Sequence, residues 1–600
     1  MISNRLATLA SLTSCVALSQ AASPWPITFS SNETVGPDGP WNVITFNIDF
    51  PDQTQWFLPS LLETSVIVNA SACTSQQSNC QSPATGMWKG SGAQLLRAAM
   101  NSATFGPDAW NDEAGIYTTA VMGLEGTLRY VSDRFTLSAD GDTEYLNMVA
   151  TAVADNVSVT YPGGQAYTLD VGYLSLYGGA ATFNWTAADG ETAVSQNLTL
   201  PRAYNQSAIP SISYGLHVGS AAHGVPGSLY WGGYDQARVI GDPVSAAADN
   251  GFFSLVDVSL GVESGESALL NTTSSSVTGL LDTSTATSLT TRADPGVPYL
   301  YLPGSTCASI AAHLPVNYDA DYGLYIWDTT ADSYEQLVTS PHHLSFTFAS
   351  NTTIAVPLAL LNLTLSSRVT DSAGGSTYFP CRPYTATSSS DQQPEAILGR
   401  AFLQAAFLGQ NWQSGATWLA QAPGPAGING NGVAEEVVVK TIEEADTELT
   451  RTTGAPGWAE TWKGVLNALE EGEGGSTTTD TGSDDSESVE EGLSAGAKAG
   501  VGVGAAVVVV GVVVGVVWWL RRGKKDNKTA GGAAMAAEMG SGPEQQHLQQ
   551  QQPLWGTQSG ELAGREVVEM AGGHKWPGEL ESYHHASELD AGHPGTGRPA

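Results

Sequence analysis

The stretch with the clearest chemical potential is Arg292–Pro303, which reads as a sharp acidic turn followed by a short aromatic strand. Pro295 fixes φ and Gly296 allows φ above zero, so this turn can hold the Asp294 carboxylate at its rim. Two carboxylates held close together cannot both ionise, so they share one proton and act as an acid and a base. A second acid from another segment, held close to this turn, would therefore allow acid–base chemistry.

Short strand-like runs, separated by Gly, Pro, Asn and Asp, fill residues 22–427 and must position this turn. Examples are residues 42–48, 126–131 and 228–231, which are rich in β-branched and aromatic side chains. About 400 residues of β structure is large for one sandwich and suits two β lobes. We therefore predict a mainly β, bilobal domain over residues 22–427.

Several segments of this block resemble the pepsin-like family of aspartic proteases, most closely its divergent membrane-anchored fungal members. Gly227–Asp235 looks like the family's strand and turn near the lobe junction. Ala396–Leu403 is similar to the segment before the last strands, where the family usually has Asp in place of Arg400. Asp170–Leu176 and Leu419–Pro423 resemble the matching first-lobe segment and the closing strand of fungal relatives.

The resemblance covers about residues 40–423 and implies a bilobal fold with one Asp-Thr/Ser-Gly turn in each lobe. Asp294 falls where the family has its second catalytic Asp, and Gly296 falls on the Gly. Pro295 replaces the usual Thr or Ser, which removes a hydroxyl and a backbone donor from the turn. The alternative is that Asp294 is an ordinary turn residue before a proline.

The first lobe departs from the family's pattern. Spacing to the first cysteine aligns the expected Asp with Ser60, the Thr with Leu61 and the Gly with Leu62. A serine has no titratable proton near neutral pH, so a shared-proton pair cannot form there. An alternative reads Glu63–Ser65 as a disguised Asp-Thr-Gly, at the cost of a three-residue shift. Tyr117 is a candidate for the family's flap tyrosine, but its flanking register is poor and we do not assign the role.

Four cysteines remain outside the predicted signal segment, an even number that suggests two disulfides in an oxidising compartment. Sequence alone allows three pairings, and the resemblance implies Cys73 with Cys80 and Cys307 with Cys381. A zinc site needs denser Cys and His spacing, and we expect no metal and no cofactor.

The ends of the chain predict a membrane protein. Residues 1–21 have the basic start, apolar run and small-residue cleavage site of a secretory signal. Residues 499–520 are uncharged and long enough to span a bilayer as a helix. Four Arg and Lys residues follow at once, which places residues 521–600 in the cytosol. Nine sequons precede this segment and indicate a glycosylated ectodomain: Asn32, Asn69, Asn156, Asn184, Asn197, Asn205, Asn271, Asn351 and Asn362.

The remaining segments read as unfolded connections. Residues 428–498 form an acidic Ser/Thr/Gly-rich stalk, with a possible short amphipathic helix around Trp458 and Trp462. The tail, residues 521–600, is Gly-, Gln-, Glu- and His-rich and reads as disordered. The chain has 23 Lys and Arg against 59 Asp and Glu, a formal charge of −36, which excludes a generic nucleic-acid binder.

We favour a single-pass cell-surface glycoprotein, N-terminus outside, whose aspartic-protease-like ectodomain has lost its catalytic pair. Its cleft would bind an extended peptide or a cell-wall component. One alternative is an active surface endopeptidase using Asp294 with another partner. Another is a structural or sensor module, in which the stalk holds the ectodomain off the membrane and the tail recruits cytosolic partners. The sequence names neither the ligand nor a tail partner.

Overall fold

β-strands are the main regular secondary structure of the described residues, as the strand-like runs predict. The computed structural model describes residues 22–48, 52–73, 80, 86–88, 101–105 (backbone only), 121–139, 141–187, 191–246, 251–283, 287–370, 372–386, 394–428, 437–451, 454 and 456–470. All of them lie in one compact unit, Met1–Thr477. The predicted signal segment, membrane helix and cytosolic tail, and Tyr117, lie outside the described residues. Among the described helices none is long and apolar enough to cross a membrane.

The first lobe is an 11-stranded sheet whose longest hairpin joins β7 and β8. Its order is β11-β12-β8-β5-β10-β4-β3-β7-β6, with β2 paired to β3 and β9 to β8. The last six residues of β4 are all buried, so this strand carries its C-terminal end into the interior. The strands are β2 Phe29–Val35, β3 Trp41–Ile48, β4 Gln53–Ser60, β5 Ser65–Val68, β6 Asn101–Phe105, β7 Leu124–Ala139, β8 Asp142–Thr160, β9 Ala166–Thr168, β10 Gly172–Ser175, β11 Thr182–Thr186 and β12 Ala193–Asn197.

The second lobe combines an eight-stranded and a four-stranded sheet. Their orders are β24-β23-β17-β19-β28-β20-β27, with β18 on β17, and β21-β22-β26-β25. The strands are β17 Phe253–Val262, β18 Ser276–Val277, β19 Leu289–Ala293, β20 Leu300–Leu302, β21 Val316–Asp319, β22 Leu324–Trp327, β23 His342–Phe348, β24 Thr353–Pro357, β25 Leu363–Leu365, β26 Ser376–Phe379, β27 Cys381–Pro383 and β28 Ala396–Leu398.

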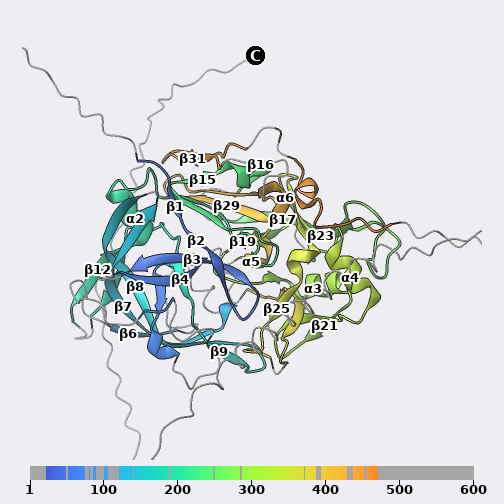
Figure 1. Cartoon of the computed structure of the whole chain (residues 1–600), viewed down its shortest axis with the longest axis horizontal. Coiled ribbons are helices and arrows are strands. Elements are labelled where there is room, and N and C mark those ends of the chain that lie inside the picture. The colour runs from blue at the N-terminus through green and yellow to red at the C-terminus, as the bar shows by residue number, and fades with distance from the viewer. Residues whose placement is uncertain are drawn as a thin grey trace, which may run out of the picture. The chain divides into compact units, whose positions relative to one another are not determined.

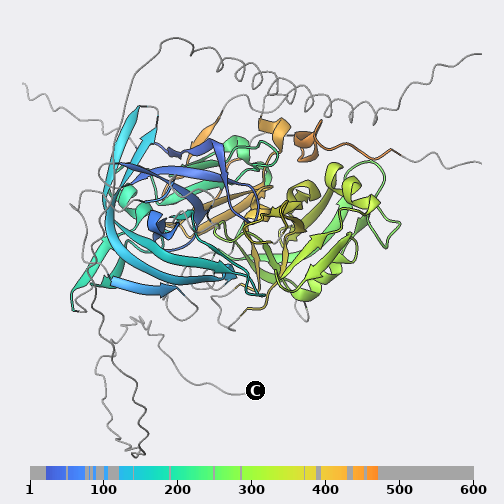
Figure 2. The same cartoon turned by 60° about the horizontal axis from the view of Figure 1, so that its bottom comes forward.

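A six-stranded sheet of order β1-β14-β13-β29-β30-β16 joins segments from three parts of the chain. Its strands are β1 Trp25–Ile27, β13 Ser213–His217, β14 Ser228–Trp231, β16 Ile240–Ser245, β29 Ala406–Asn411 and β30 Ala416–Gln421. In Figure 1 the blue and cyan first-lobe strands lie on one side and the yellow-green second-lobe strands on the other, and Figure 2 shows the same division after rotation. The predicted mainly β, two-lobed architecture is therefore present in the described residues.

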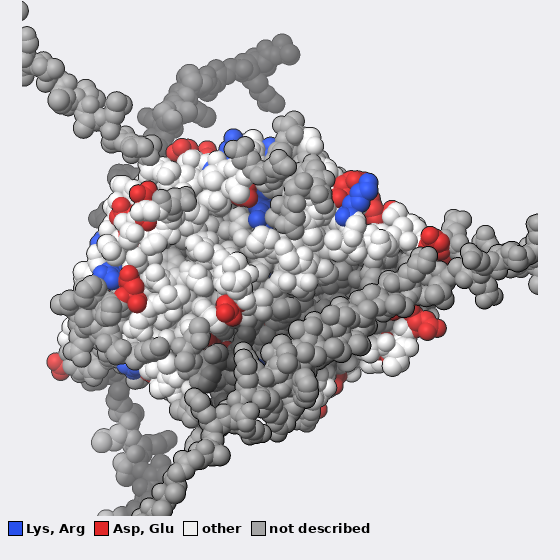
Figure 3. All heavy atoms as spheres, viewed as in Figure 1, with Lys and Arg blue, Asp and Glu red and all other residues white. Residues whose placement is uncertain are grey.

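Short helices fill the connections between strands. They are η1 Ala70–Ala72, α2 Thr199–Asn205, η2 Gln236–Arg238, α3 Gly304–Ala311, α4 Asp332–Thr339, η3 Leu358–Leu361, α5 Arg400–Leu403, α6 Pro425–Ile428 and η4 Ala459–Trp462. Charged side chains are scattered over the face in Figure 3, where the described residues form no broad basic patch. That view agrees with the acidic composition.

Both expected disulfides are present. Cys73 bonds Cys80 with their Cα atoms 5.9 Å apart, and Cys307 bonds Cys381 with a Cα separation of 5.7 Å. The second bridge ties α3 to β27 within the second lobe. The pairing that the family resemblance implied is confirmed.

The folded block extends past its predicted end at residue 427. Strand β31 (Val439–Thr441) pairs with β15 (Gly233–Asp235), and Ile442 is wholly buried. The predicted amphipathic helix is only the short η4, whose Trp462 is buried. Residues 437–451 and 456–470 thus pack on the fold because their backbone and aromatic groups find partners there. The predicted stalk can begin only after them.

Candidate active site

The acidic turn of the second lobe begins directly after β19. Asp294 has no exposed surface, and its backbone N–H donates to Leu398 O at 3.0 Å. Its Oδ1 accepts a hydrogen bond of 2.8 Å from the backbone N–H of Gly296. Gly296 is not among the described glycines with positive φ, so the expected left-handed backbone is absent here. The turn instead holds its shape through the Asp294 carboxylate.

The corresponding position in the first lobe holds Ser60, the last residue of β4. Ser60 is wholly buried, and its backbone O accepts from Leu176 N at 2.9 Å. Its Oγ lies 3.5 Å from Leu174 O, at the long limit of a hydrogen bond. The next residues, Leu61 and Leu62, are also buried. The turn therefore presents apolar side chains where the family has Thr and Gly.

Strand pairing supports treating these two positions as equivalent. In the first lobe β10 lies between β4, to which it is parallel, and β5, to which it is antiparallel. In the second lobe β28 lies in the same way between parallel β19 and antiparallel β20. Ser60 pairs with Ser175, while Ala293 pairs with Leu398, so Asp294 and Gly399 follow one step later. Ser60 matches Asp294, and Ser175 matches Gly399.

The two lobes differ in the space available for a side chain at the matched positions Ser175 and Gly399. A Cβ at Gly399 would lie 2.4 Å from Val297 O and 2.5 Å from Tyr299 O, too close for any side chain. Ser175 carries a side chain, and its Oγ donates towards Leu62 O at 2.7 Å and Glu63 O at 2.9 Å. The first-lobe turn therefore accommodates a side chain where the second-lobe turn accommodates none.

Glu63, the residue of the alternative alignment, lies in the turn between β4 and β5. It is half-buried, whereas Ser60 and Asp294 have no exposed surface. Its backbone carbonyl is one of the acceptors for Ser175. The structure thus gives Glu63 an environment unlike that of the two matched positions.

Arg400, noted in the sequence only as a replacement for Asp, contacts the acidic turn directly. Its Nη1 donates to Pro295 O at 3.0 Å and Gly296 O at 2.9 Å. Its Nη2 lies 3.7 Å from Asp38 Oδ2, and its guanidinium stacks over the Trp41 ring at 5.0 Å. Asp38 and Trp41 lie at the start of the first lobe, so Arg400 links that segment to the turn after Asp294.

Buried tyrosines from both lobes surround this contact. Tyr161 OH and Tyr299 OH lie 3.1 Å apart, and Tyr378 OH donates to Asp38 O. Burial raises the pKa of each of these phenols well above its ordinary value, so all three stay neutral at physiological pH. These tyrosines therefore contribute neutral hydrogen-bonding groups near the acidic turn and do not serve as additional acids.

Each of the two β lobes places a strand between a parallel and an antiparallel neighbour, and one lobe has an acidic turn directly after the parallel strand, as the resemblance to pepsin-like proteases implies. The family model described as eukaryotic aspartyl protease matches residues 178–422. This chain therefore carries a domain of the eukaryotic aspartyl protease family over that range. Asp294 lies inside the matched range, and Ser60 lies before it.

Among solved structures, the chain matches one described as "Crystal structure of aspartic proteinase from Irpex lacteus". The identity is 14%, the TM-score is 0.42, and the match covers 67% of this chain and 98% of the other. No curated protein matches the chain.

Proposed function

We propose that this protein is a cell-surface glycoprotein whose aspartic-protease-like ectodomain does not hydrolyse peptides. The observation that carries the proposal is Ser60 at the end of β4, at the position that Asp294 occupies directly after β19. Peptide hydrolysis by this fold uses two acids that share one proton. A serine hydroxyl cannot share or exchange that proton near neutral pH, so Ser60 cannot act as the second acid.

The surroundings of both turns favour the same conclusion. Leu61 and Pro295 replace the hydroxyl residues that the family pattern has after each Asp. Ser175 Oγ bonds the first-lobe turn through Leu62 O and Glu63 O, and Arg400 bonds the second through two carbonyls. Both turns are thus held by side chains that donate hydrogen bonds to their backbone carbonyls, and none of these side chains is a second acid.

The proposed role is recognition, with an extended peptide or a cell-wall component as the ligand. The predicted signal segment, membrane helix and sequons support a surface location. Every one of the nine sequon asparagines is exposed or half-exposed, which glycan attachment requires. In this proposal the ectodomain senses its ligand and the cytosolic tail transmits the signal. Deleting residues 521–600 alone should then abolish a cell-surface stress response while leaving ligand binding intact.

A peptidase assay on the purified full chain tests the loss of catalysis. A pool of fluorogenic peptides is incubated at about pH 3–6, where carboxylates titrate, with and without pepstatin. We expect cleavage at the background level of an Asp294→Asn control. Pepstatin-sensitive cleavage that disappears in Asp294→Asn would instead establish an active endopeptidase and overturn the proposal.

A binding assay tests the recognition role separately. The full chain is mixed with a pool of extended peptides and, in a second arm, with insoluble β-glucan. We expect saturable binding in one arm that is unchanged by Asp294→Asn, because recognition does not use the carboxylate. If the chain binds neither the peptides nor the β-glucan, the recognition role is refuted, and the conclusion on catalysis is unaffected.

A further inference from the structure

A small cavity lies between the lobes beside the acidic turn. Its volume is about 20 Å³, and its wall includes Asp38 and Tyr161 from the first lobe and Tyr301, Arg382 and Arg400 from the second. A single water needs roughly 10–15 Å³ by the same kind of measure. The cavity therefore has room for one small group, and not for a peptide side chain of any size.

Two polar side-chain atoms of the lining residues have no hydrogen-bond partner in the described residues. They are Nε of Arg400, a residue only 3% exposed, and Oη of Tyr301, which is 2% exposed. The other guanidinium nitrogens of Arg400 already contact Pro295 O, Gly296 O and Asp38. Buried donors are almost always paired, and an orphaned one costs about 1–3 kcal/mol. We therefore expect a hydrogen-bond acceptor in the cavity that pairs with both atoms.

The charge of the wall indicates what kind of acceptor that is. Arg382 and Arg400 contribute two positive charges and Asp38 one negative charge. The Asp38 carboxylate is already engaged, since Oδ1 accepts from Trp41 Nε1 at 2.9 Å and Oδ2 faces Arg400. Burial raises the pKa of Tyr301, so its hydroxyl remains a neutral donor. A wall with a net positive charge and two free donors suits an anion better than a water molecule.

We propose that this cavity is a binding site for a small monoanion, either a free ion such as formate or chloride or the carboxylate of a ligand. Arg400 Nε–H and Tyr301 O–H donate to the anion, and Arg400 joins it to the acidic turn through Pro295 and Gly296. The site draws its affinity from buried donors and does not require that the domain has lost peptidase activity.

Thermal unfolding of the purified full chain tests the site. Sodium formate and sodium chloride are titrated at constant ionic strength, and a bound anion raises the midpoint with concentration. We expect Tyr301→Phe to lower the apparent affinity at least tenfold while leaving the midpoint in anion-free buffer unchanged or higher, because the lost hydroxyl had no partner. Tyr384→Phe is the matched control, since its ring lies 6.2 Å from that of Tyr301 without lining the cavity.

A short peptide acid and its amide distinguish the two sources of the anion. A larger shift with the acid than with both its amide and formate indicates a ligand carboxylate, and a shift with formate or chloride alone indicates a free ion. Crystals grown in bromide should show an anomalous peak within hydrogen-bonding distance of Arg400 Nε and Tyr301 Oη. No anion-dependent shift and no such peak, with a water in the cavity instead, would overturn the proposal.

Discussion

Ser175 and Gly399 occupy matched positions with opposite steric demands, which gives a paired test at the level of single residues. Gly399→Ala should cost about 2–3 kcal/mol, because its Cβ would meet two backbone carbonyl oxygens that cannot move independently. Ser175→Ala should cost only about 1 kcal/mol, since the Cβ is already accommodated and only the Oγ bonds are lost. Chemical denaturation of both variants measures the difference, and equal effects would refute the asymmetry between the turns.

Asp38 and Arg400 form a buried ion pair that joins the first-lobe start to the acidic turn. Their side chains are 6% and 3% exposed, so removing one charge leaves the other buried and unpaired. We expect Arg400→Met or Asp38→Asn alone to cost about 3–5 kcal/mol. The double variant should cost clearly less than the sum. Additive losses in a double-mutant cycle would show that the pair is not coupled.

Sequence reasoning found the residues of the candidate site but not their connections. Ser60 could be placed by its spacing to the first cysteine, and Asp294 by the acidic turn before a short aromatic strand, both of which are local signals. The link from Arg400 to Asp38 joins residues hundreds of positions apart in sequence. The tyrosines of the cavity likewise come from separate strands. A single sequence shows such residue types but not which of them meet.

At the scale of elements, the segment after residue 437 is a strap that completes the fold. Asn411 Nδ2 donates to the backbone oxygens of Glu443, Glu444 and Asp446 at 2.9–3.2 Å. Trp418 Nε1 donates to Thr447 O at 3.0 Å. Asn411 and Trp418 are wholly buried, and their side-chain N–H groups donate to backbone oxygens of this segment.

A truncation series tests the strap. A chain ending at residue 427 loses these bonds and exposes the sites of Ile442 and Trp462, so its unfolding midpoint should fall by roughly 5–10 °C or it should aggregate. A chain ending at residue 470 keeps every contact and should match the full chain. Equal midpoints for the two truncated chains would show that the segment contributes nothing to stability.

The sequence analysis did not predict the strap, because its composition indicates an unfolded segment although it packs on the folded domain. Its many Glu and Asp residues are typical of an unfolded stalk, and among its described residues Ile442 and Trp462 are the apolar side chains that are fully buried. Most of its attachment comes from backbone groups, as in the pairing of β31 with β15. Backbone hydrogen bonding leaves no trace in residue types, so a polar segment can dock without a hydrophobic pattern.

For the molecule as a whole, the two-lobed β architecture could be predicted because strand-like runs and turn residues recur throughout residues 22–427. The six-stranded sheet could not, since it gathers β1 from the start, β13 and β14 from the middle and β29 and β30 from the end. Chain length and composition suggest how many lobes to expect. Which strands meet between them depends on long-range packing.

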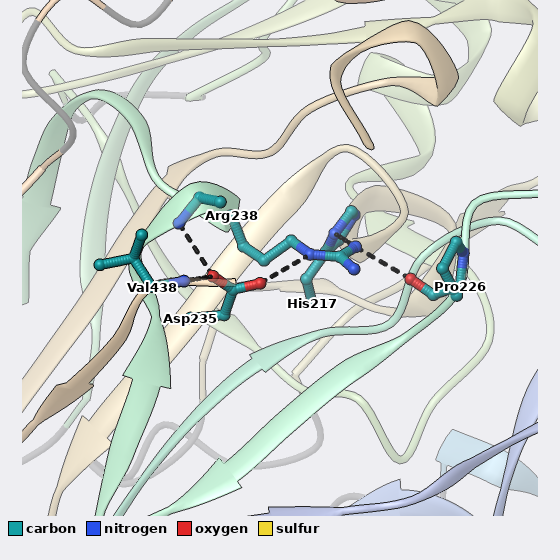
Figure 4. A network of polar contacts seen from close by, with 6 residues as sticks. His217, Pro226, Asp235, Arg238 and Val438 are labelled. Atoms are coloured by element: carbon teal, nitrogen blue, oxygen red, sulfur yellow. Dashed lines mark hydrogen bonds and ion pairs between the residues drawn. The ribbon is translucent and has the colours of Figure 1, made fainter. Parts of the chain in front are cut away.

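Buried neutral histidines couple this sheet and its neighbour to pH. Figure 4 shows His217 beside Arg238, whose Nη1 lies 3.2 Å from Nδ1 and whose Nε contacts Asp235. Burial, with Arg238 adding to it, lowers the pKa of His217 to about 3. Burial also lowers the pKa of His342 to about 4 and that of His223 and His343 below the ordinary value.

These lowered values predict that the ectodomain weakens in acid. Between about pH 6.5 and pH 3 these histidines bind protons in the unfolded chain but stay neutral in the folded chain. The free energy of unfolding therefore has its full value above the unfolded-state pKa and falls as the pH decreases below it. We expect the unfolding midpoint to drop steadily below about pH 6.5. His217→Gln should reduce the difference in unfolding midpoint between pH 7 and pH 4.5.

This acid sensitivity also governs how the peptidase assay is interpreted. Circular dichroism at each pH separates a folded chain that lacks a second acid from an unfolded chain that cannot bind substrate. Absence of cleavage counts against catalysis only where the signal is native. A chain with an unfolding midpoint that stays constant from pH 7 to pH 4 would refute the role of the buried histidines. It would also make the whole acidic range valid for testing whether Asp294 acts alone.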